Sequence, residues 1–236
     1  MNCFRRNYRL AIVLAAVLSG SQSAQASSSL IADLNEASKS MVRVSALAEG
    51  FDSSSAGTGL LRMEKTGAGI LITSSGVIVT NAHTLAGAQK VAVQTHDGQQ
   101  WPAALIAVSG EDDLALLKIE TGKALPFAQL ASAEQLTAGD TLYTIGNSMF
   151  LKQTLSEGIL LGIGRRGAGP WGGGADAALL RISFKVYPGD SGTPILSRQG
   201  KLYGIISANA GQTAIAVSSS RILLGLEKFY PEWSGS

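Results

Sequence analysis

Short apolar segments of β-type character recur along most of the chain and are separated by turn-forming residues. Turn signals such as Ser75-Gly76, Asp97-Gly98 and Gly200 lie between them. Many short strands at this spacing predict an all-β protein built as a sandwich or as barrels. The predicted strands are residues 41–47, 70–73, 77–80, 91–95, 101–108, 114–119, 141–145, 154–161, 179–184, 202–208 and 213–217.

Helical periodicity is confined to the two ends of this β-rich region. Residues 30–37 and 222–229 place apolar side chains at helical spacing, and the serines at 218–220 are expected to cap the second helix. A more polar stretch from Glu120 to Gln135, which contains Pro126, is expected to join two halves. No internal repeat is evident in the sequence.

The first 26 residues have the pattern of a secretory signal peptide. Three arginines precede the apolar run Leu10–Leu18, and Ala24-Gln25-Ala26 places small residues where a signal peptidase cleaves. The apolar run is too short for a transmembrane anchor, which needs about 18 residues. We therefore expect export of the protein, cleavage after Ala26 and no membrane anchor.

Composition narrows the class of protein further. Glycine contributes 28 of the 236 residues and charged residues only 15%, which suits a compact chain with many turns and excludes a disordered one. Loss of the signal peptide would leave 16 basic and 17 acidic residues and would remove Cys3, the only cysteine. Such a neutral chain is unlike a nucleic-acid-binding protein. With no cysteine and two histidines in unrelated contexts, we expect no metal. The chemistry predicted below also needs no cofactor.

Three separated segments together predict nucleophilic catalysis. They place a histidine, an aspartate and a serine in the chain order of the chymotrypsin-type triad. The candidates are His83, Asp113 and Ser191. The segments are residues 80–85 (TNAHTL), 113–119 (DLALLKI) and 188–194 (PGDSGTP).

Each residue type meets a separate chemical need. A serine hydroxyl is a weak nucleophile until an imidazole accepts its proton, and a carboxylate on the other ring nitrogen fixes the tautomer of that imidazole. The tight turn Gly189-Asp190-Ser191 is expected to direct the N–H groups of Gly189 and Ser191 at a developing oxyanion. Of the neighbouring acids, Asp113 abuts the apolar strand, whereas Glu111 and Asp112 are expected to face solvent.

The segments 67–83 (GAGILITSSGVIVTNAH), 113–119 (DLALLKI) and 188–196 (PGDSGTPIL) resemble those of trypsin-like serine proteases of the bacterial HtrA/Deg type. The similarity covers roughly residues 40–230. It implies two packed six-stranded antiparallel β-barrels with the triad between them and a C-terminal helix. On this resemblance we expect a partly helical segment at 27–39, a first barrel at 40–125, and a second barrel with the helix at 126–236.

The sequence departs from the HtrA pattern in two ways. Asp190 and Thr193 stand where that family usually has asparagine and glycine. The carboxylate of Asp190 therefore needs a partner, and the sequence does not decide whether the oxyanion turn is formed before substrate binds. No PDZ segment follows the protease motifs, so PDZ-driven regulation is not expected.

Substrate contacts are expected at Lys185, which the resemblance places at the floor of the pocket for the side chain before the scissile bond. Relatives accept small aliphatic side chains there. An ammonium in such a pocket is costly unless it reaches solvent, pairs with an acid such as Asp190, or meets a substrate carboxylate. The segment at Ser207, Ala208 and Asn209 is expected to be the strand edge that binds the substrate main chain.

Two further motifs receive plainer interpretations. Residues 162–167 (GIGRRG) match a dinucleotide fingerprint, but the glycine-rich residues that follow cannot form the required helix. This loop is expected near the cleft, where Arg165, Arg166 and Trp171 could contact substrate or another subunit or could simply be exposed to solvent. His96 lies in a turn and is expected to be solvated.

The sequence thus predicts a serine endopeptidase of protein or peptide substrates, exported to the periplasm or secreted, with an oligomeric state that the sequence does not define. A second hypothesis is a non-catalytic peptide-binding or chaperone-like module on the same fold. A third is an enzyme specific for a single host or envelope protein.

Overall fold

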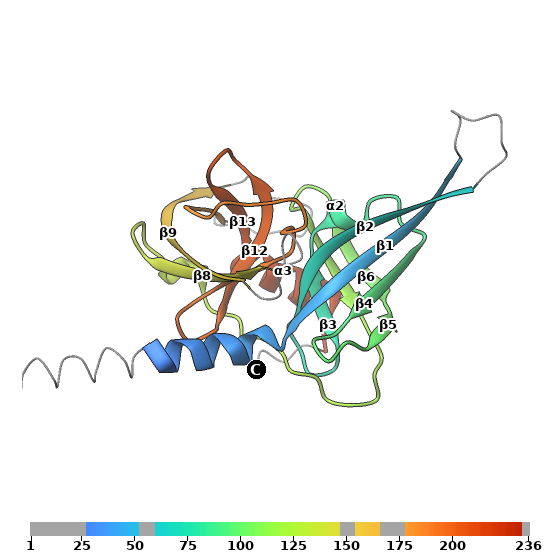
Figure 1. The fold of residues 1–236 in the computed structure, drawn as a ribbon, viewed down its shortest axis with the longest axis horizontal. Helices are drawn as coiled ribbons and strands as arrows, with labels where there is room; N and C mark the ends of the chain where they lie inside the picture. Colours follow the sequence, from blue (N-terminus) through green and yellow to red (C-terminus); the bar gives the residue numbers. More distant parts are fainter. Residues whose placement is uncertain (1–26, 52–59, 147–153, 166–177, 233–236) are drawn as a thin grey trace, which may run out of the picture.

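The computed structural model describes residues 27–51, 60–146, 154–165 and 178–232. Two β-structures pack side by side, and a helix over residues 27–38 runs beneath the second one (Figure 1). The predicted signal peptide lies outside the described residues. Within the described ranges, no helix combines the length and apolar character needed to cross a membrane.

The first β-structure is a curled seven-stranded antiparallel sheet of order β5-β4-β1-β2-β3-β7-β6. Its edge strands β5 and β6 are separated only by Ala103, so the single strand predicted over 101–108 is bent there and serves both edges. Pro102 cannot donate a ladder hydrogen bond, which favours the break. The strands are β1 (Met41–Phe51), β2 (Leu60–Leu71), β3 (Val77–Thr80), β4 (Lys90–Gln94), β5 (Gln100–Pro102), β6 (Ala104–Ser109) and β7 (Leu114–Lys118).

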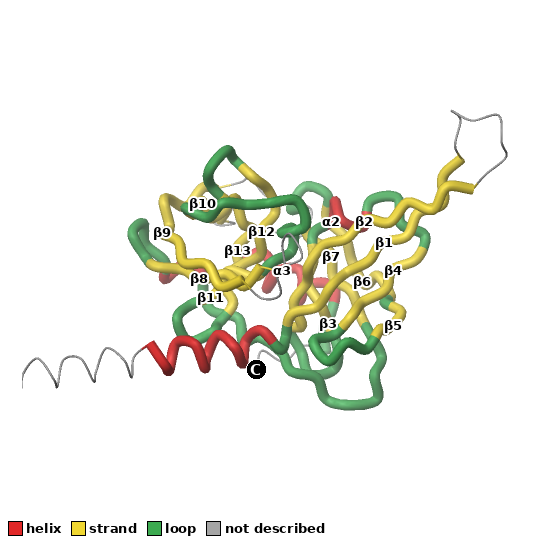
Figure 2. Tube along the Cα trace, in the orientation of Figure 1, coloured by secondary structure: helices red, strands yellow, loops and turns green. Residues whose placement is uncertain are grey.

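The second β-structure is a closed antiparallel barrel of order β10-β13-β12-β11-β8-β9 (Figure 2). Its strand β11 was not predicted because it has only three residues and begins with a proline. The strands are β8 (Thr141–Gly146), β9 (Thr154–Arg165), β10 (Ala178–Ile182), β11 (Pro194–Leu196), β12 (Leu202–Asn209) and β13 (Ala214–Ser218). The helical elements α2 (Ala82–Leu85), η1 (Ala133–Gln135) and α3 (Ser219–Phe229) complete the fold.

Strand β7 is a continuous apolar run in the sequence because both of its faces are buried. Ala115 and Leu117 point into the core of the first sheet. Leu114 and Leu116 point the other way, into a cluster that also contains residues of the second barrel. A strand that is buried on both faces needs apolar residues at consecutive positions.

Helix α3 covers this shared cluster with Ile222 and Leu226, both of which are fully buried. The all-β class and the C-terminal helix predicted from the sequence are confirmed. The expected capping by serines is wrong, because Ser218 occupies the N-cap position without a side-chain cap hydrogen bond. Ser219 instead donates to the carbonyl oxygen of Ala131 at 2.5 Å and ties the helix to the connection between the halves.

Candidate active site

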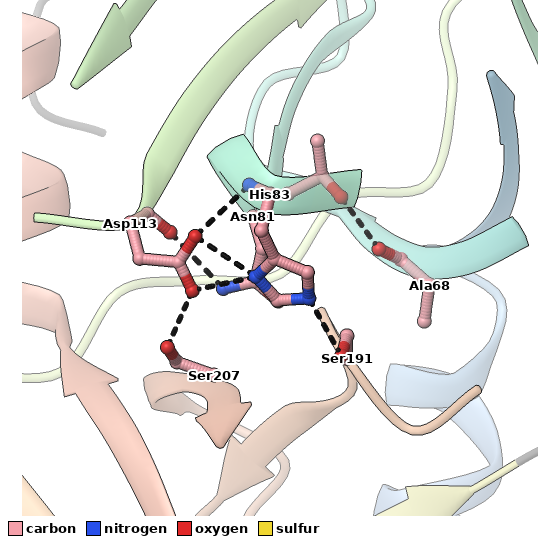
Figure 3. A network of polar contacts seen from close by, with 7 residues as sticks. Ala68, Asn81, His83, Asp113, Ser191 and Ser207 are labelled. Atoms are coloured by element: carbon pink, nitrogen blue, oxygen red, sulfur yellow. Dashed lines mark hydrogen bonds and ion pairs between the residues drawn. The ribbon is translucent and has the colours of Figure 1, made fainter. Parts of the chain in front are cut away.

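The three predicted catalytic side chains lie together between the two β-structures. His83 Nδ1 is 2.9 Å from both carboxylate oxygens of Asp113, and His83 Nε2 is 3.0 Å from Ser191 Oγ (Figure 3). His83 and Asp113 lie in segments that connect strands of the first sheet, whereas Ser191 lies in the turn before β11 of the second barrel. The geometry gives an unbroken hydrogen-bonded path from a carboxylate through an imidazole to a hydroxyl.

His83 is carried by the short helix α2, which directly follows the buried strand β3. Its main-chain N–H donates to Asp113 Oδ1 at 3.0 Å, in addition to the contact that its ring makes. The carboxylate therefore fixes both the backbone and the ring of the histidine. The His83 side chain is about half exposed, so the ring is held in place without being sealed from solvent.

Asp113 occupies the turn before β7 with a φ of 53°, the only left-handed non-glycine residue in the described part of the chain. Aspartate tolerates this conformation better than most residues. Asn81 Nδ2 donates to the Asp113 carbonyl oxygen at 3.1 Å, and Ser207 Oγ donates to Asp113 Oδ2 at 2.5 Å. Asp113 is thereby held through its main chain from the first sheet and through its carboxylate from the second barrel.

Ser191 sits in a turn that requires glycine on either side. Gly189 and Gly192 have φ values of 97° and 84°. A Cβ at Gly192 would lie 1.9 Å from the carbonyl oxygen of Ala68, so no other residue fits there without a shift. The Ala68 N–H donates to the Ser191 carbonyl oxygen at 2.7 Å, which fastens the turn to β2.

Asp190, the departure from the HtrA pattern, is buried within the same turn. Its Oδ2 accepts a hydrogen bond from the main-chain N–H of Tyr187 at 2.8 Å, and its own N–H donates to the Tyr187 carbonyl oxygen at 3.1 Å. The Asp190 carbonyl oxygen accepts from Thr193 N–H at 3.0 Å. The carboxylate therefore has a partner inside the turn that it stabilises.

The residues expected to bind substrate have varied surroundings. Lys185 is exposed, and its Nζ lies 5.4 Å from the centroid of the Tyr187 ring. Ser207 lies at a register shift of β12, and its side chain is directed to Asp113 rather than to a substrate. Ala208 and Asn209 are exposed, and Asn209 Nδ2 donates to the Val186 carbonyl oxygen at 3.1 Å.

Two predictions concern residues away from the triad. His96 is exposed in the turn after β4, as expected. The contacts proposed for Arg165, Arg166 and Trp171 lie outside the residues whose side chains the structure describes. Across the described ranges, no group of three histidine, cysteine or acidic side chains gathers that could hold a metal ion.

The expectation that Asp112 faces solvent is wrong. Its side chain is almost completely buried, with Oδ1 at 3.1 Å from Arg221 Nε and Oδ2 accepting from Ser109 Oγ at 2.7 Å. Sequence analysis missed this pair, and it also missed Asn81 and the contact of Ser207 with Asp113. The one available signal was Asn81 itself, a polar residue between an apolar strand and the candidate histidine.

A sequence profile of the trypsin-like peptidase domain matches residues 67–205, which is more than half of the chain and includes all three triad candidates. The chain belongs to the trypsin-like peptidase family. It is 35% identical over 148 residues to the putative serine protease HhoA of Synechocystis, a match that covers 62% of this chain and 38% of HhoA. It is 33% identical over 146 residues to the periplasmic pH-dependent serine endoprotease DegQ of Escherichia coli, covering 61% of this chain and 31% of DegQ.

These relatives support the HtrA-type resemblance within the trypsin-like peptidases, although the matched part spans only about a third of their length. The solved structure of the HtrA-type protease AlgW with a decapeptide superimposes with a TM-score of 0.71 at 23% identity, over 87% of this chain and 68% of AlgW. The structure of AlgW with a tripeptide gives a TM-score of 0.67 at 24% identity, over 84% and 61%. The trypsin-like fold is thereby confirmed.

Proposed function

We propose that this trypsin-like peptidase is a serine endopeptidase that hydrolyses peptide bonds through an acyl-enzyme. The observation that carries the proposal is the hydrogen-bonded path from Asp113 through His83 to Ser191, with both links at 2.9–3.0 Å. These lengths lie within the reach required between a nucleophile and its general base.

In the proposed reaction, Ser191 Oγ attacks the scissile carbonyl carbon while His83 Nε2 accepts the hydroxyl proton. His83 then donates that proton to the leaving amine as the C–N bond breaks, which leaves Ser191 acylated. A water molecule attacks the ester with the same base, and the carboxyl product departs as Ser191 recovers its proton. Asp113 orients the imidazole and stabilises its cationic form throughout.

The developing oxyanion would be stabilised by the main-chain N–H groups of Gly189 and Ser191. The conformation of this turn is supported by Asp190, whose carboxylate and main chain both contact Tyr187. A turn held by internal hydrogen bonds supplies oriented dipoles without reorganisation during the reaction.

Proteins or peptides are the proposed substrates, and their main chain would align along Ser207, Ala208 and Asn209. The two AlgW structures, solved with a decapeptide and with a tripeptide, fit this class of ligand. Because Lys185 is exposed and its ammonium lies near Tyr187, we propose that it stays in solvent and that small aliphatic side chains are preferred before the scissile bond.

The proposed domain limits, 40–125 and 126–236, divide the chain in the segment between β7 and β8. We also propose export to the periplasm or the medium after removal of residues 1–26. DegQ and several other relatives are named as periplasmic serine proteases. Mass spectrometry of the exported protein would find Ser27 at its N-terminus, whereas an intact Met1 would contradict the export proposal.

Labelling by a fluorophosphonate probe tests the activity itself. The probe reacts with a serine only if that serine is activated, so we expect labelling of wild type at Ser191 and none of Ser191→Ala. The Ser191→Ala variant should melt like wild type, because it removes one hydroxyl from a partly exposed turn. Peptide binding without labelling would instead support the non-catalytic module.

A further inference from the structure

A buried ion pair joins the loop that carries Asp113 to the C-terminal helix. Arg221 Nε lies 3.1 Å from Asp112 Oδ1, and the side chains of the two residues are 3% and 1% exposed. The proposed reaction uses neither charge. Burying these two charges costs free energy, because taking ions out of water is unfavourable unless the geometry of the pair and its other hydrogen bonds compensate.

The position of Arg221 in the helix indicates that this arginine is not there to stabilise the helix itself. It lies in the first turn of α3, where the helix dipole disfavours a positive charge. The helix is already anchored by the buried side chains of Ile222 and Leu226. The arginine therefore occupies an unfavourable helix position in order to meet Asp112.

On the loop side, Asp112 is the residue immediately before Asp113, and it organises the turn. Ser109 Oγ donates to Asp112 Oδ2 at 2.7 Å and accepts from the Asp112 N–H at 3.1 Å. The next residue then adopts the left-handed φ of 53° that directs its carboxylate at His83. A strained conformation of this kind persists only where the surrounding structure holds it.

We propose that Arg221 and Asp112 are positioning residues, which fix the backbone on the N-terminal side of Asp113 and thereby orient its carboxylate toward His83. Helix α3 thus contributes to catalysis although it carries none of the triad residues. The inference rests on the proposed peptidase activity. It adds a third support for Asp113 beside those from Asn81 and Ser207.

The test compares Asp112→Asn, Arg221→Met and the double variant with wild type, using kinetics per active site as titrated by the fluorophosphonate probe. Misplacement of a catalytic group by about 1 Å can lower a rate about 100-fold, so we expect kcat to fall by about that factor in each single variant with KM unchanged. Because the pair acts as a unit, the double variant should lose no more than either single one. Arg221→Lys keeps the charge but loses the geometry of the guanidinium, and it should recover part of the activity.

Two measurements separate positioning from a loss of stability. The proton on His83 Nδ1 that is bound to Asp113 should give a far-downfield NMR signal in wild type, and this signal should weaken or shift in Arg221→Met. Leu226→Ala, a cavity variant in the same helix, should lower the melting temperature but preserve the signal and kcat per titrated site. If Arg221→Met fails to fold, Arg221→Lys carries the comparison.

Unchanged kcat per active site and an unchanged proton signal in the folded pair variants would overturn the positioning role. Equal loss of both in Leu226→Ala would overturn it as well, because general loosening of the helix would then account for the effect. An unlabelled, inactive wild-type protein would instead refute the proposed peptidase function itself.

Discussion

The main-chain N–H of Ala68 donates a hydrogen bond of 2.7 Å to the carbonyl oxygen of Ser191. This contact joins strand β2 of the first sheet to the turn of the candidate nucleophile in the second barrel. The carbonyl oxygen of Ala68 meanwhile accepts from Thr80 Oγ1 at 2.8 Å and lies against Gly192. One peptide strand therefore sets the distance between the two halves of the site.

Gly192→Ala should disrupt this contact. The added Cβ would lie 1.9 Å from the Ala68 carbonyl oxygen, and alanine is also strained at a φ of 84°. We expect a loss of about 1–2 kcal/mol from the backbone conformation and about 1–3 kcal/mol more from overpacking, together with a large fall in kcat. Urea denaturation and peptide hydrolysis measure the two effects.

Gly98→Ala is the matched control for that substitution. Gly98 has a φ of 83°, but nothing lies within 4 Å of its added Cβ. It should lose only the conformational share of stability and keep full activity. Equal stability losses in the two variants would show that the close approach of the added Cβ at residue 192 to the Ala68 carbonyl oxygen does not affect stability.

Ser207→Ala removes the hydroxyl that donates to Asp113 Oδ2. Hydrogen bonds to charged groups contribute about 1.5 kcal/mol or more, so we expect kcat to fall about 10-fold. KM should not change, since alanine preserves the main-chain groups proposed to bind substrate. Ser75→Ala, which alters an exposed hydroxyl in the turn before β3, should leave both constants unaltered; a rise in KM for Ser207→Ala would indicate that the hydroxyl contacts substrate.

Acid stability should depend on Asp97 in the turn between β4 and β5. The Thr95 hydroxyl above all, with Lys123 and the Gln99 N–H, lowers the pKa of Asp97 from 3.8 to about 2. A depressed pKa means that this carboxylate stabilises the fold above pH 3.8, and that the contribution is lost as the pH falls toward 2. Melting curves between pH 2 and 6 should show a shallower dependence for Asp97→Asn than for wild type.

Two companion variants test the cause of that shift. Since the hydrogen bond from Thr95 is the largest contribution, Thr95→Val should remove more of the pH dependence than Lys123→Met. The reverse order would mean that the ion pair, whose Nζ and Oδ2 are 3.2 Å apart, dominates instead.

Cleavage specificity should survive the loss of Lys185. Because its ammonium is exposed beside Tyr187, both wild type and Lys185→Ala are expected to cut a peptide library after small aliphatic residues. Enrichment of aspartate or glutamate before the cut in wild type, and its loss in the variant, would identify Lys185 as a receptor for acidic side chains.

The sequence predicted strands well where burial produces a clear pattern of apolar residues. Strand β7 was predicted because its two faces enter different cores, which makes Leu114–Leu117 continuously apolar. Strand β11 left no such trace, because three residues beginning at Pro194 carry too short a pattern. The bend at Ala103 was missed for a similar reason, since residues 101–108 form one apolar run that continues across it.

The site was partly predictable for a different reason. His83, Asp113 and Ser191 stand in motifs whose residue types follow from the chemistry, so local sequence is enough to nominate them. The supports of Asp113 come from elsewhere in the chain: Arg221 from the last helix, through Asp112, and Ser207 from the second barrel. Such long-range partners depend on tertiary packing, which a single sequence does not disclose.

The cluster between the two β-structures draws its side chains from both of them and from helix α3, so the outward face of β7 stays in water until the halves meet. His83 and Asp113 lie on one side of that seam and Ser191 on the other. Because the candidate base and the candidate nucleophile lie in different halves, neither half alone can form the hydrogen-bonded path from Asp113 to Ser191. Recovery of activity during refolding would therefore report the docking of the two halves, whereas circular dichroism would report the formation of their strands.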